Sequence, residues 1–231
     1  MKICAIGDIH GRTCWKNIAV EDYDKIIFLG DYCDSFFHSD AEIFENLREI
    51  LILKKSFPEK IILLLGNHDV HYAYSPKYRA TGFRNSMEFL LKDLFEMNKD
   101  FFQMAFQHNN YLFTHAGVSN AWFLKNKTII EKADVEKENI SLAEALNRIL
   151  DSSSRDILME VGYIRGGHSW NKGGIVWADR SETKDDFLNG FHQIVGHSPV
   201  PDIIRLGNEK ESITYIDCLD SVKKFWQSDQ I

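Results

Sequence analysis

Five short polar clusters, each directly after an apolar run, contain most of the residues in this chain that could carry out chemistry. They are rich in aspartate, histidine and asparagine, whose oxygen and nitrogen atoms are ligands for divalent metal ions. The clusters are Gly7-Asp8-Ile9-His10-Gly11, Gly30-Asp31-Tyr32-Cys33-Asp34, Gly66-Asn67-His68-Asp69, Thr114-His115-Ala116-Gly117 and Gly196-His197-Ser198. Their residue types predict a metal centre that is assembled from five separate segments.

The number of ligand-type residues favours two metal ions over one structural zinc, which needs only four ligands. Two ions roughly 3.5–4 Å apart stabilise both the attacking and the leaving oxygen of an in-line displacement at phosphorus. Each cluster alone is a weak signal, because a Gly-Asp turn is ordinary turn chemistry and a single histidine at a strand end more often packs than binds metal. The prediction depends on all five clusters occurring together.

The apolar runs before the clusters predict strands that deliver these side chains to one place. We expect strands at residues 2–7, 24–30, 60–66 and 111–115, and a helix at 40–57 that stops before Pro58. Alternation of strand and helix predicts parallel pairing with right-handed crossovers. Parallel strands gather their carboxyl ends along one edge of a sheet, and such folds bind ligands there.

The rest of the chain predicts further helices, loops and late strands without an obvious domain boundary. We expect a loop at 70–82, one or two helices at 85–106, a charged helical stretch at 119–162, and strands at 174–178, 193–196 and 212–216. Ser141 and Glu144 have the spacing of a helix capping box. No Pro/Gly/Ser-rich linker divides the chain, so we expect one domain over 1–231, with about 119–172 as a helical flap beside the site.

Composition excludes several classes of protein. The 231 residues have a formal net charge of -7 and no block of Lys or Arg, which argues against a protein that grips long nucleic acid through its phosphates. Four scattered cysteines suggest neither a disulfide framework nor a zinc knuckle. The apolar start is too short for a signal peptide, and no stretch reaches membrane-spanning length. We therefore expect a cytoplasmic protein with no membrane partner.

The clusters in this order resemble the motifs of the calcineurin-like metallophosphoesterase superfamily. The nearest resemblance is to the serine/threonine phosphoprotein phosphatases and the symmetrical diadenosine tetraphosphate hydrolases. Ile175 to Asp179 also resembles the Trp-Ser-Asp stretch of that branch, and the motifs run from Asp8 to His197. The resemblance implies an α/β fold, an αββα sandwich with the metal site at the carboxyl ends of the strands.

The resemblance also implies a role for each site residue. Asp8, His10 and Asp31 would hold one metal, Asn67, His115 and His197 would complete the second, and Asp31 would bridge them. His68 would be the general acid, oriented by Asp34. The implied cofactor is two divalent ions, with Mn expected and Fe or Zn as alternatives. The implied reaction is in-line attack of a metal-bound hydroxide on a phosphoester or phosphoanhydride.

One departure from the family pattern concerns substrate binding. The phosphatases carry an arginine directly after the second aspartate of the second motif, where it clamps the phosphate, but here Asp34 is followed by Ser35 and Phe36. The candidate replacements are Arg12, Arg79, Arg84 and Arg180, and we predict Arg79 or Arg84 as the substrate-binding residue. The other interpretation of each arginine is a solvated surface residue. The departure weakens the case for a protein phosphatase more than the case for a phosphoesterase.

Three interpretations of function therefore remain open. A hydrolase of nucleotides or dinucleoside polyphosphates is slightly favoured over a phosphoprotein phosphatase, because Tyr72, Tyr74 and Tyr78 could line a cleft and stack on a base. The expected partner is a small phosphorylated substrate or a phosphoprotein, and the oligomeric state is not predicted. A non-catalytic scaffold is the third interpretation. Four histidines lie outside the clusters, and we expect them at the surface or behind the ligands: His71, His108, His168 and His192.

Overall fold

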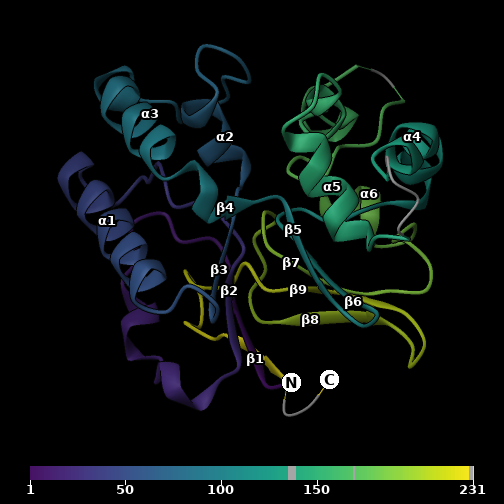
Figure 1. The fold of residues 1–231 in the computed structure, drawn as a ribbon, viewed down its shortest axis with the longest axis horizontal. Helices are drawn as coiled ribbons and strands as arrows, with labels where there is room; N and C mark the ends of the chain where they lie inside the picture. Colours follow the sequence, from purple (N-terminus) through teal and green to yellow (C-terminus); the bar gives the residue numbers. More distant parts are fainter. Residues whose placement is uncertain (135–138, 169, 229–230) are drawn as a thin grey trace.

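Two five-stranded sheets face one another, and helices cover their outer sides (Figure 1). The computed structural model describes residues 1–134, 139–168, 170–228 and 231. The first sheet has the order β10-β1-β2-β3-β4, and the second has the order β5-β6-β7-β9-β8. The first contains β1 (Ile3–Ile6), β2 (Lys25–Phe28), β3 (Ile61–Leu64), β4 (Phe102–Gln103) and β10 (Trp226–Ser228). The second contains β5 (Ala105–His108), β6 (Tyr111–Thr114), β7 (His192–Val195), β8 (Ile204–Gly207) and β9 (Ser212–Tyr215).

The central strands of both sheets are parallel, as the sequence predicts. Strands β1 to β4 pair in parallel, and so do β6, β7 and β9. The antiparallel strands β10, β5 and β8 lie at the edges. The two sheets and their covering helices confirm the expected αββα class.

Side chains of the first sheet alternate between two apolar cores, because successive residues of a strand point to opposite faces. In β1, Ile3 and Ala5 pack into the core between the sheets, whereas Cys4 and Ile6 pack beneath the helices. The unbroken apolar run of β3 follows the same rule, with Ile62 and Leu64 on the inner face. Burial on both faces explains why these strands contain no polar alternation.

The outer side of the first sheet is covered by α1 (Asp40–Ser56), α2 (Asn67–Ala73) and α3 (Glu88–Met97) (Figure 1). The outer side of the second is covered by α4 (Asn120–Lys132), α5 (Leu142–Leu150) and α6 (Arg180–Thr183). Short 3₁₀ helices span Cys14–Asn17, Val20–Asp22, Asn85–Met87, Lys99–Phe101, Arg155–Ile157 and Tyr163–Arg165. Ser39 and Glu42 form a capping box that starts α1. At α5, Ser141 caps the helix by accepting from the Glu144 amide. None of the helices in the described ranges could cross a membrane.

Three expected elements are wrong or incomplete. Residues 174–178 form a turn, closed by bonds from Trp177 N and Ala178 N to Gly174 O, rather than a strand. Their apolar residues are buried without pairing as a ladder, so burial rather than strand formation explains the pattern. The expected loop at 70–82 begins as helix, because α2 runs to Ala73. The expected helical stretch at 85–106 ends in β4 and the start of β5.

Candidate active site

The six candidate metal ligands come from the carboxyl ends of five strands in both sheets. Asp8 and His10 follow β1, Asp31 follows β2, Asn67 begins α2 after β3, His115 follows β6, and His197 follows β7. His10, Asp31 and His197 have φ angles of 43°, 53° and 64°, in the left-handed region. Non-glycine residues adopt this region at a cost, and such residues cluster at functional sites.

Glycines in the clusters allow the segments to approach closely. A Cβ atom on Gly66 would lie 2.1 Å from Asp31 Oδ1, and one on Gly196 would lie 2.2 Å from Asp8 Oδ1. Each distance is far below van der Waals contact, so any side chain would push a candidate ligand out of place. The glycines before Asn67 and His197 are therefore requirements of the site's geometry.

Asp8, His10 and Asp31 form the first ligand group, with one ligand atom from each lying within 4.8 Å of the others. His10 Nδ1 donates to the carbonyl oxygens of Cys33 and Asp34 at 2.8 and 3.0 Å. Since Nδ1 carries the proton, Nε2 has a free lone pair, and it lies 3.6 Å from Asp31 Oδ2. A backbone bond of this kind fixes the tautomer of a metal-binding histidine.

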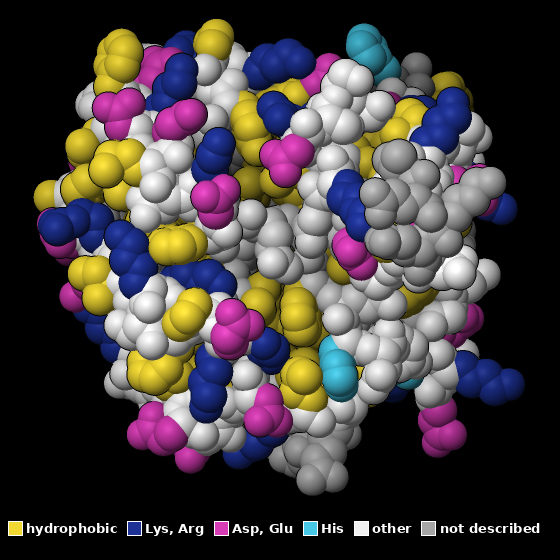
Figure 2. Space-filling model, in the orientation of Figure 1, with side chains coloured by type: hydrophobic (Ala, Val, Ile, Leu, Met, Phe, Trp, Pro, Cys, Tyr) yellow, Lys and Arg dark blue, Asp and Glu magenta, His cyan; other side chains and the backbone are white. Residues whose placement is uncertain are grey.

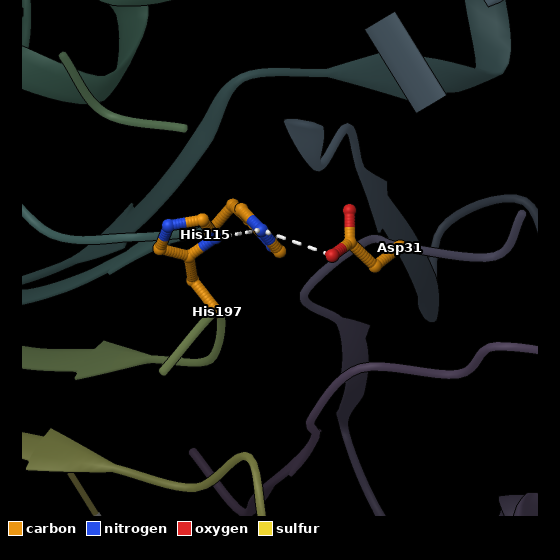
Figure 3. A group of neighbouring side chains, drawn as sticks. All are labelled: Asp31, His115 and His197. Atoms are coloured by element: carbon orange, nitrogen blue, oxygen red, sulfur yellow. Dashed lines mark hydrogen bonds and ion pairs between the residues drawn. The ribbon is translucent and has the colours of Figure 1, made fainter. Parts of the chain in front are cut away.

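Asp31, His115 and His197 form the second ligand group, and Figure 3 shows their side chains directed toward one another. His115 Nδ1 donates to Leu29 O at 2.8 Å, so His115 Nε2 holds a lone pair. That atom lies 3.0 Å from Asn67 Oδ1, 3.2 Å from His197 Nδ1 and 3.4 Å from Asp31 Oδ2. Imidazole nitrogens and carboxylate or amide oxygens are ligands for divalent cations, and here they converge on one point. The donor set therefore fits a metal ion.

Asp69, at the end of the third cluster, fixes the backbone that presents these ligands. Its side chain is fully buried, and Oδ2 accepts from Asp31 N at 2.7 Å and Gly66 N at 2.8 Å. Oδ1 accepts from Tyr32 N at 2.9 Å and Cys33 N at 3.3 Å. One carboxylate thus ties the turn after β2 to the turn after β3.

His68 and Asp34 form a hydrogen-bonded pair beside the ligands. His68 Nδ1 donates to Asp34 Oδ2 at 2.8 Å, and Tyr72 Oη donates to Asp34 Oδ1 at 2.6 Å. His71 is fully buried, and its Nε2 lies 2.9 Å from Asp34 Oδ2 as an ion-pair contact without hydrogen-bond geometry. Tyr72 and His71 therefore add to the predicted pair two groups that hold the carboxylate.

Opposing effects set the electrostatics of the site. Burial alone would raise the pKa of Asp31, but the surrounding histidines, His115 first, bring it below its usual range. Burial opposes the charged form of His68, yet the carboxylates of Asp31 and Asp34 raise the pKa of His68 to about 9. Burial lowers the pKa of His197 well below its usual range, which leaves its ring neutral and able to bind metal.

Asp217, at the end of β9, is a further carboxylate of the site that sequence reasoning missed. It lines the same cavity as Asp8 and Asp31, and burial followed by the charges of these two residues raises the pKa of Asp217 to about 9. The signal was available, because Ile213 to Ile216 is an apolar-rich run that ends in a carboxylate. This segment lacks the glycine and histidine that marked the other strand ends.

A cavity of about 960 Å³ contains most of these groups. Six of the predicted site residues line it: Asp8, His10, Asp31, Asn67, His68 and His197. Residues of the predicted flap also line the cavity, among them Arg165, His168 and Asn171. The three tyrosines that were expected to line a nucleotide cleft do not line this cavity. Tyr72 donates to Asp34, and Tyr78 donates to Asp156. Tyr74 lines a separate cavity with Phe95. The tyrosines therefore give no support to a nucleotide cleft.

The predicted arginines have different surroundings. Arg79 lines the cavity, where its guanidinium binds both oxygens of Glu88 at 2.8 Å and lies 4.4 Å from the Phe83 ring centre. Arg84 lines an adjoining cavity and is engaged with Asp40 and the Ser35 carbonyl.

Two other candidates do not line the large cavity, whereas one unexpected arginine does. Arg12 pairs with Asp220 and donates through Nη1 to the Asp8 carbonyl at 3.1 Å, and Arg180 packs over the Tyr215 ring at 5.6 Å. Arg165, which sequence reasoning missed, lines the large cavity and pairs through Nε with Asp179 at 2.7 Å. It lies in a glycine-flanked segment without a motif, so nothing in the local sequence marked it.

Comparison with known proteins identifies the architecture. A family model described as calcineurin-like phosphoesterase matches residues 1–210. This chain belongs to the calcineurin-like phosphoesterase family. Its membership supports a metal-dependent hydrolase of the phosphatase type, with candidate metal-binding groups at the expected strand ends.

Solved structures of phosphatases share the fold at low identity. A cold-active protein-tyrosine phosphatase of the psychrophile Shewanella sp. is 18% identical with a TM-score of 0.58, over 96% of this chain and 72% of that one. A serine/threonine phosphatase of Saccharomyces cerevisiae, similar to human phosphatase PP5, is 15% identical with a TM-score of 0.54, over 96% and 69%. No curated protein matches the sequence. At these identities the likeness shows the fold alone.

Proposed function

We propose that this chain is a binuclear metal-dependent phosphohydrolase that cleaves phosphoester or phosphoanhydride bonds. The observation that carries the proposal is the position of Asp31, which belongs to both ligand groups. A single carboxylate that reaches two sets of ligands is the arrangement that a bridged pair of ions needs. The first ion would be held by Asp8, His10 and Asp31, and the second by Asp31, Asn67, His115 and His197.

The donor set also suggests the kind of metal. Imidazole nitrogens and carboxylate or amide oxygens, without a thiolate, suit Mn, Fe or Zn, and Mn is the expected activator. When bound, the two ions would offset the charge of the phosphoryl oxygens and lower the pKa of a nucleophilic water. The chain's own residues supply the remaining steps.

His68 is proposed to deliver the proton that the leaving oxygen needs. Its Nδ1 donates to Asp34, and its ring lines the cavity and is part-exposed, so Nε2 is available to a substrate. The Tyr72 hydroxyl holds Asp34 and thereby fixes the plane of the imidazole. A positioned acid of this type contributes roughly 10²–10⁴-fold to the rate.

Arginines on the cavity wall are proposed to bind the non-bridging phosphoryl oxygens. Arg79 remains a candidate, although its guanidinium already binds Glu88. Arg84 would have to leave Asp40 to reach a phosphate. We add Arg165, which lines the cavity together with His197 and is held by Asp179 and Ser198. In this view residues 119–172 act as a flap within one metallophosphoesterase domain and bring Arg165 to the substrate.

The alternatives differ in substrate or in catalysis. A phosphoprotein phosphatase would agree with the names of the similar structures, but these share the fold at 18% identity or less. A non-catalytic scaffold would not need a complete ligand set together with His68 and Asp34, and function must be argued from the site. We therefore favour a small phosphorylated substrate over a phosphoprotein or a scaffold role.

The test is metal-dependent hydrolysis by the purified protein. With Mn added, the protein should hydrolyse p-nitrophenyl phosphate, and a chelator should abolish the activity until Mn is restored. Unchanged activity after full removal of metal would contradict the proposal. A screen of phosphomonoesters, dinucleoside polyphosphates and phosphopeptides would then separate the substrate classes.

A further inference from the structure

Two phenylalanine side chains project into solvent at the edge of the site. Phe36 and Phe37 follow the Asp34-Ser35 step and are 95% and 82% exposed. Ser35 Oγ accepts from the amides of Phe37 and His38 at 3.1 and 3.2 Å, which shapes the turn that presents both rings. Large exposed apolar side chains next to a cavity are typical of ligand-binding surfaces.

Arg84 holds the turn of residues 35–38, which presents the two phenylalanines, in place. Its guanidinium binds the carbonyl oxygen of Ser35 and, through Asp40, the first turn of α1. The Asp40 carboxylate also accepts from Ser86 at 2.8 Å, which ties the turn to the start of the segment before α3. The turn that carries the two rings is therefore fixed by hydrogen bonds and an ion pair.

The rings line a second cavity, of about 320 Å³, that adjoins the metal cavity. Five residues line both cavities: His10, Phe36, His68, Pro199 and Asp217. The candidate ligands Asp31, Asn67 and His197 line only the larger one. The smaller cavity therefore shares His68 with the larger one but is not lined by most of the candidate metal ligands.

This position identifies which part of a substrate the smaller cavity would receive. An acid at His68 gives its proton to the leaving oxygen, so the leaving group must extend past His68 while the phosphoryl group lies at the metals. We propose that the smaller cavity is a subsite for a nucleoside leaving group, with its base stacked on Phe36 and Phe37. This inference rests on the proposed phosphohydrolase function and names the substrate class.

The polar groups of the cavity favour a nucleoside over a seryl or threonyl side chain. Asp220 and Asp217 line it together with the aromatic rings, and Asp220 is paired with Arg12. The oxygens of a carboxyl group accept hydrogen bonds whether or not the group is ionised, and ribose hydroxyls and base amino groups donate them. A seryl or threonyl leaving group has neither a ring to stack nor further hydroxyls to bond.

The experiment compares two substrates that share the leaving oxygen and differ in the base. Adenosine 5′-monophosphate and ribose 5-phosphate both release a primary alcohol, so their need for the acid is matched. With the Mn-loaded protein, we expect kcat/KM to be higher for the nucleotide by roughly 5- to 100-fold, the range of one stacked base. The variants Phe36→Ala and Phe37→Ala, singly and together, should bring the ratio of kcat/KM for the nucleotide to kcat/KM for ribose 5-phosphate close to one.

These variants should fold like the wild type, because both rings are exposed and neither packs in the core. Phe89→Ala is the matched control, since Phe89 is 80% exposed on α3 and lines neither cavity. Phe36→Trp should keep or increase the preference. An unchanged substrate ratio in the Phe36→Ala/Phe37→Ala double variant would overturn the subsite.

A binding measurement separates this proposal from the proposed function. Adenosine, the product, should bind in calorimetry, and the double variant should weaken its binding by roughly 5- to 100-fold. Absence of adenosine binding overturns the subsite even if p-nitrophenyl phosphate is hydrolysed. Preference for phosphopeptides over the nucleotide, unaffected by the two phenylalanines, also overturns it. Loss of all phosphatase activity with intact, phenylalanine-dependent adenosine binding would instead contradict the proposed function.

Discussion

Most of the candidate metal ligands line the same cavity as Arg79 and Arg165, yet the chain holds the two sets of residues differently. The ligands follow buried strands, and backbone groups fix their orientation, as the Leu29 carbonyl does for His115. The arginines lie outside the strands and α-helices, on a loop or in a short 3₁₀ helix, and are held by side-chain partners such as Glu88 and Asp179. The positions of the candidate ligands are thus set by the sheets, whereas the proposed substrate contacts are set by segments that can differ between relatives that share the fold.

Asp31→Asn should have the largest effect, because it removes a charge that both ligand groups share. We expect metal content to fall and the rate to drop by at least about 10³-fold, more than the loss of one outer partner of a metal ligand. Metal analysis and kcat/KM on p-nitrophenyl phosphate measure both effects. Asp93→Asn, the same change at an exposed position on α3, should leave both unchanged. Equal occupancy in Asp31→Asn and the wild type would remove Asp31 from the metal site.

His68→Asn should come next, and it separates an acid from a ligand. We expect both ions to stay bound while kcat on an alkyl phosphate falls by roughly 10²–10⁴-fold. The p-nitrophenolate group leaves without protonation, so the loss on p-nitrophenyl phosphate should be much smaller. Asp34→Asn should reproduce a milder form of the same pattern. A variant that loses metal, or slows equally on both substrates, would show that His68 is not the acid.

Substitution of the arginines should have the smallest effect and should leave the ligands intact. Arg165→Ala should raise KM, or lower kcat/KM, by roughly 10- to 100-fold, the scale of one charge-assisted contact. Arg79→Ala and Arg84→Ala test the other two positions, and Arg165→Lys should recover part of the loss by keeping the charge. Metal content should be unchanged in all four variants. If no arginine alters the kinetics, the phosphate is held by the metals alone.

The sequence predicted the ligand positions well because local rules determine them. An apolar run of four or five residues makes a strand, a glycine ends it, and the next polar residue lies at the sheet edge. That reasoning located Asp8, Asp31, Asn67, His115 and His197 at strand ends. Their role as ligands stays a prediction, but their convergence is a property of the fold.

Contacts between distant segments were not predictable in the same way. Asp69 accepts hydrogen bonds from amides 36 to 38 residues away, and Arg165 reaches Ser198, 33 residues away. No local pattern encodes such contacts, because they depend on how turns from different strands pack together. The prediction of a strand at 174–178 was wrong for a different reason. Its apolar residues indicate burial, and burial alone does not distinguish a strand from a packed turn.

The central claim is that Asp31 bridges two ions, and a crystal structure of the Mn-loaded protein with anomalous scattering tests it most directly. The account predicts two anomalous peaks roughly 3.5–4 Å apart, with Asp31 between them, Asp8 and His10 on one, and Asn67, His115 and His197 on the other. A single peak, or two peaks that do not share Asp31, would contradict it.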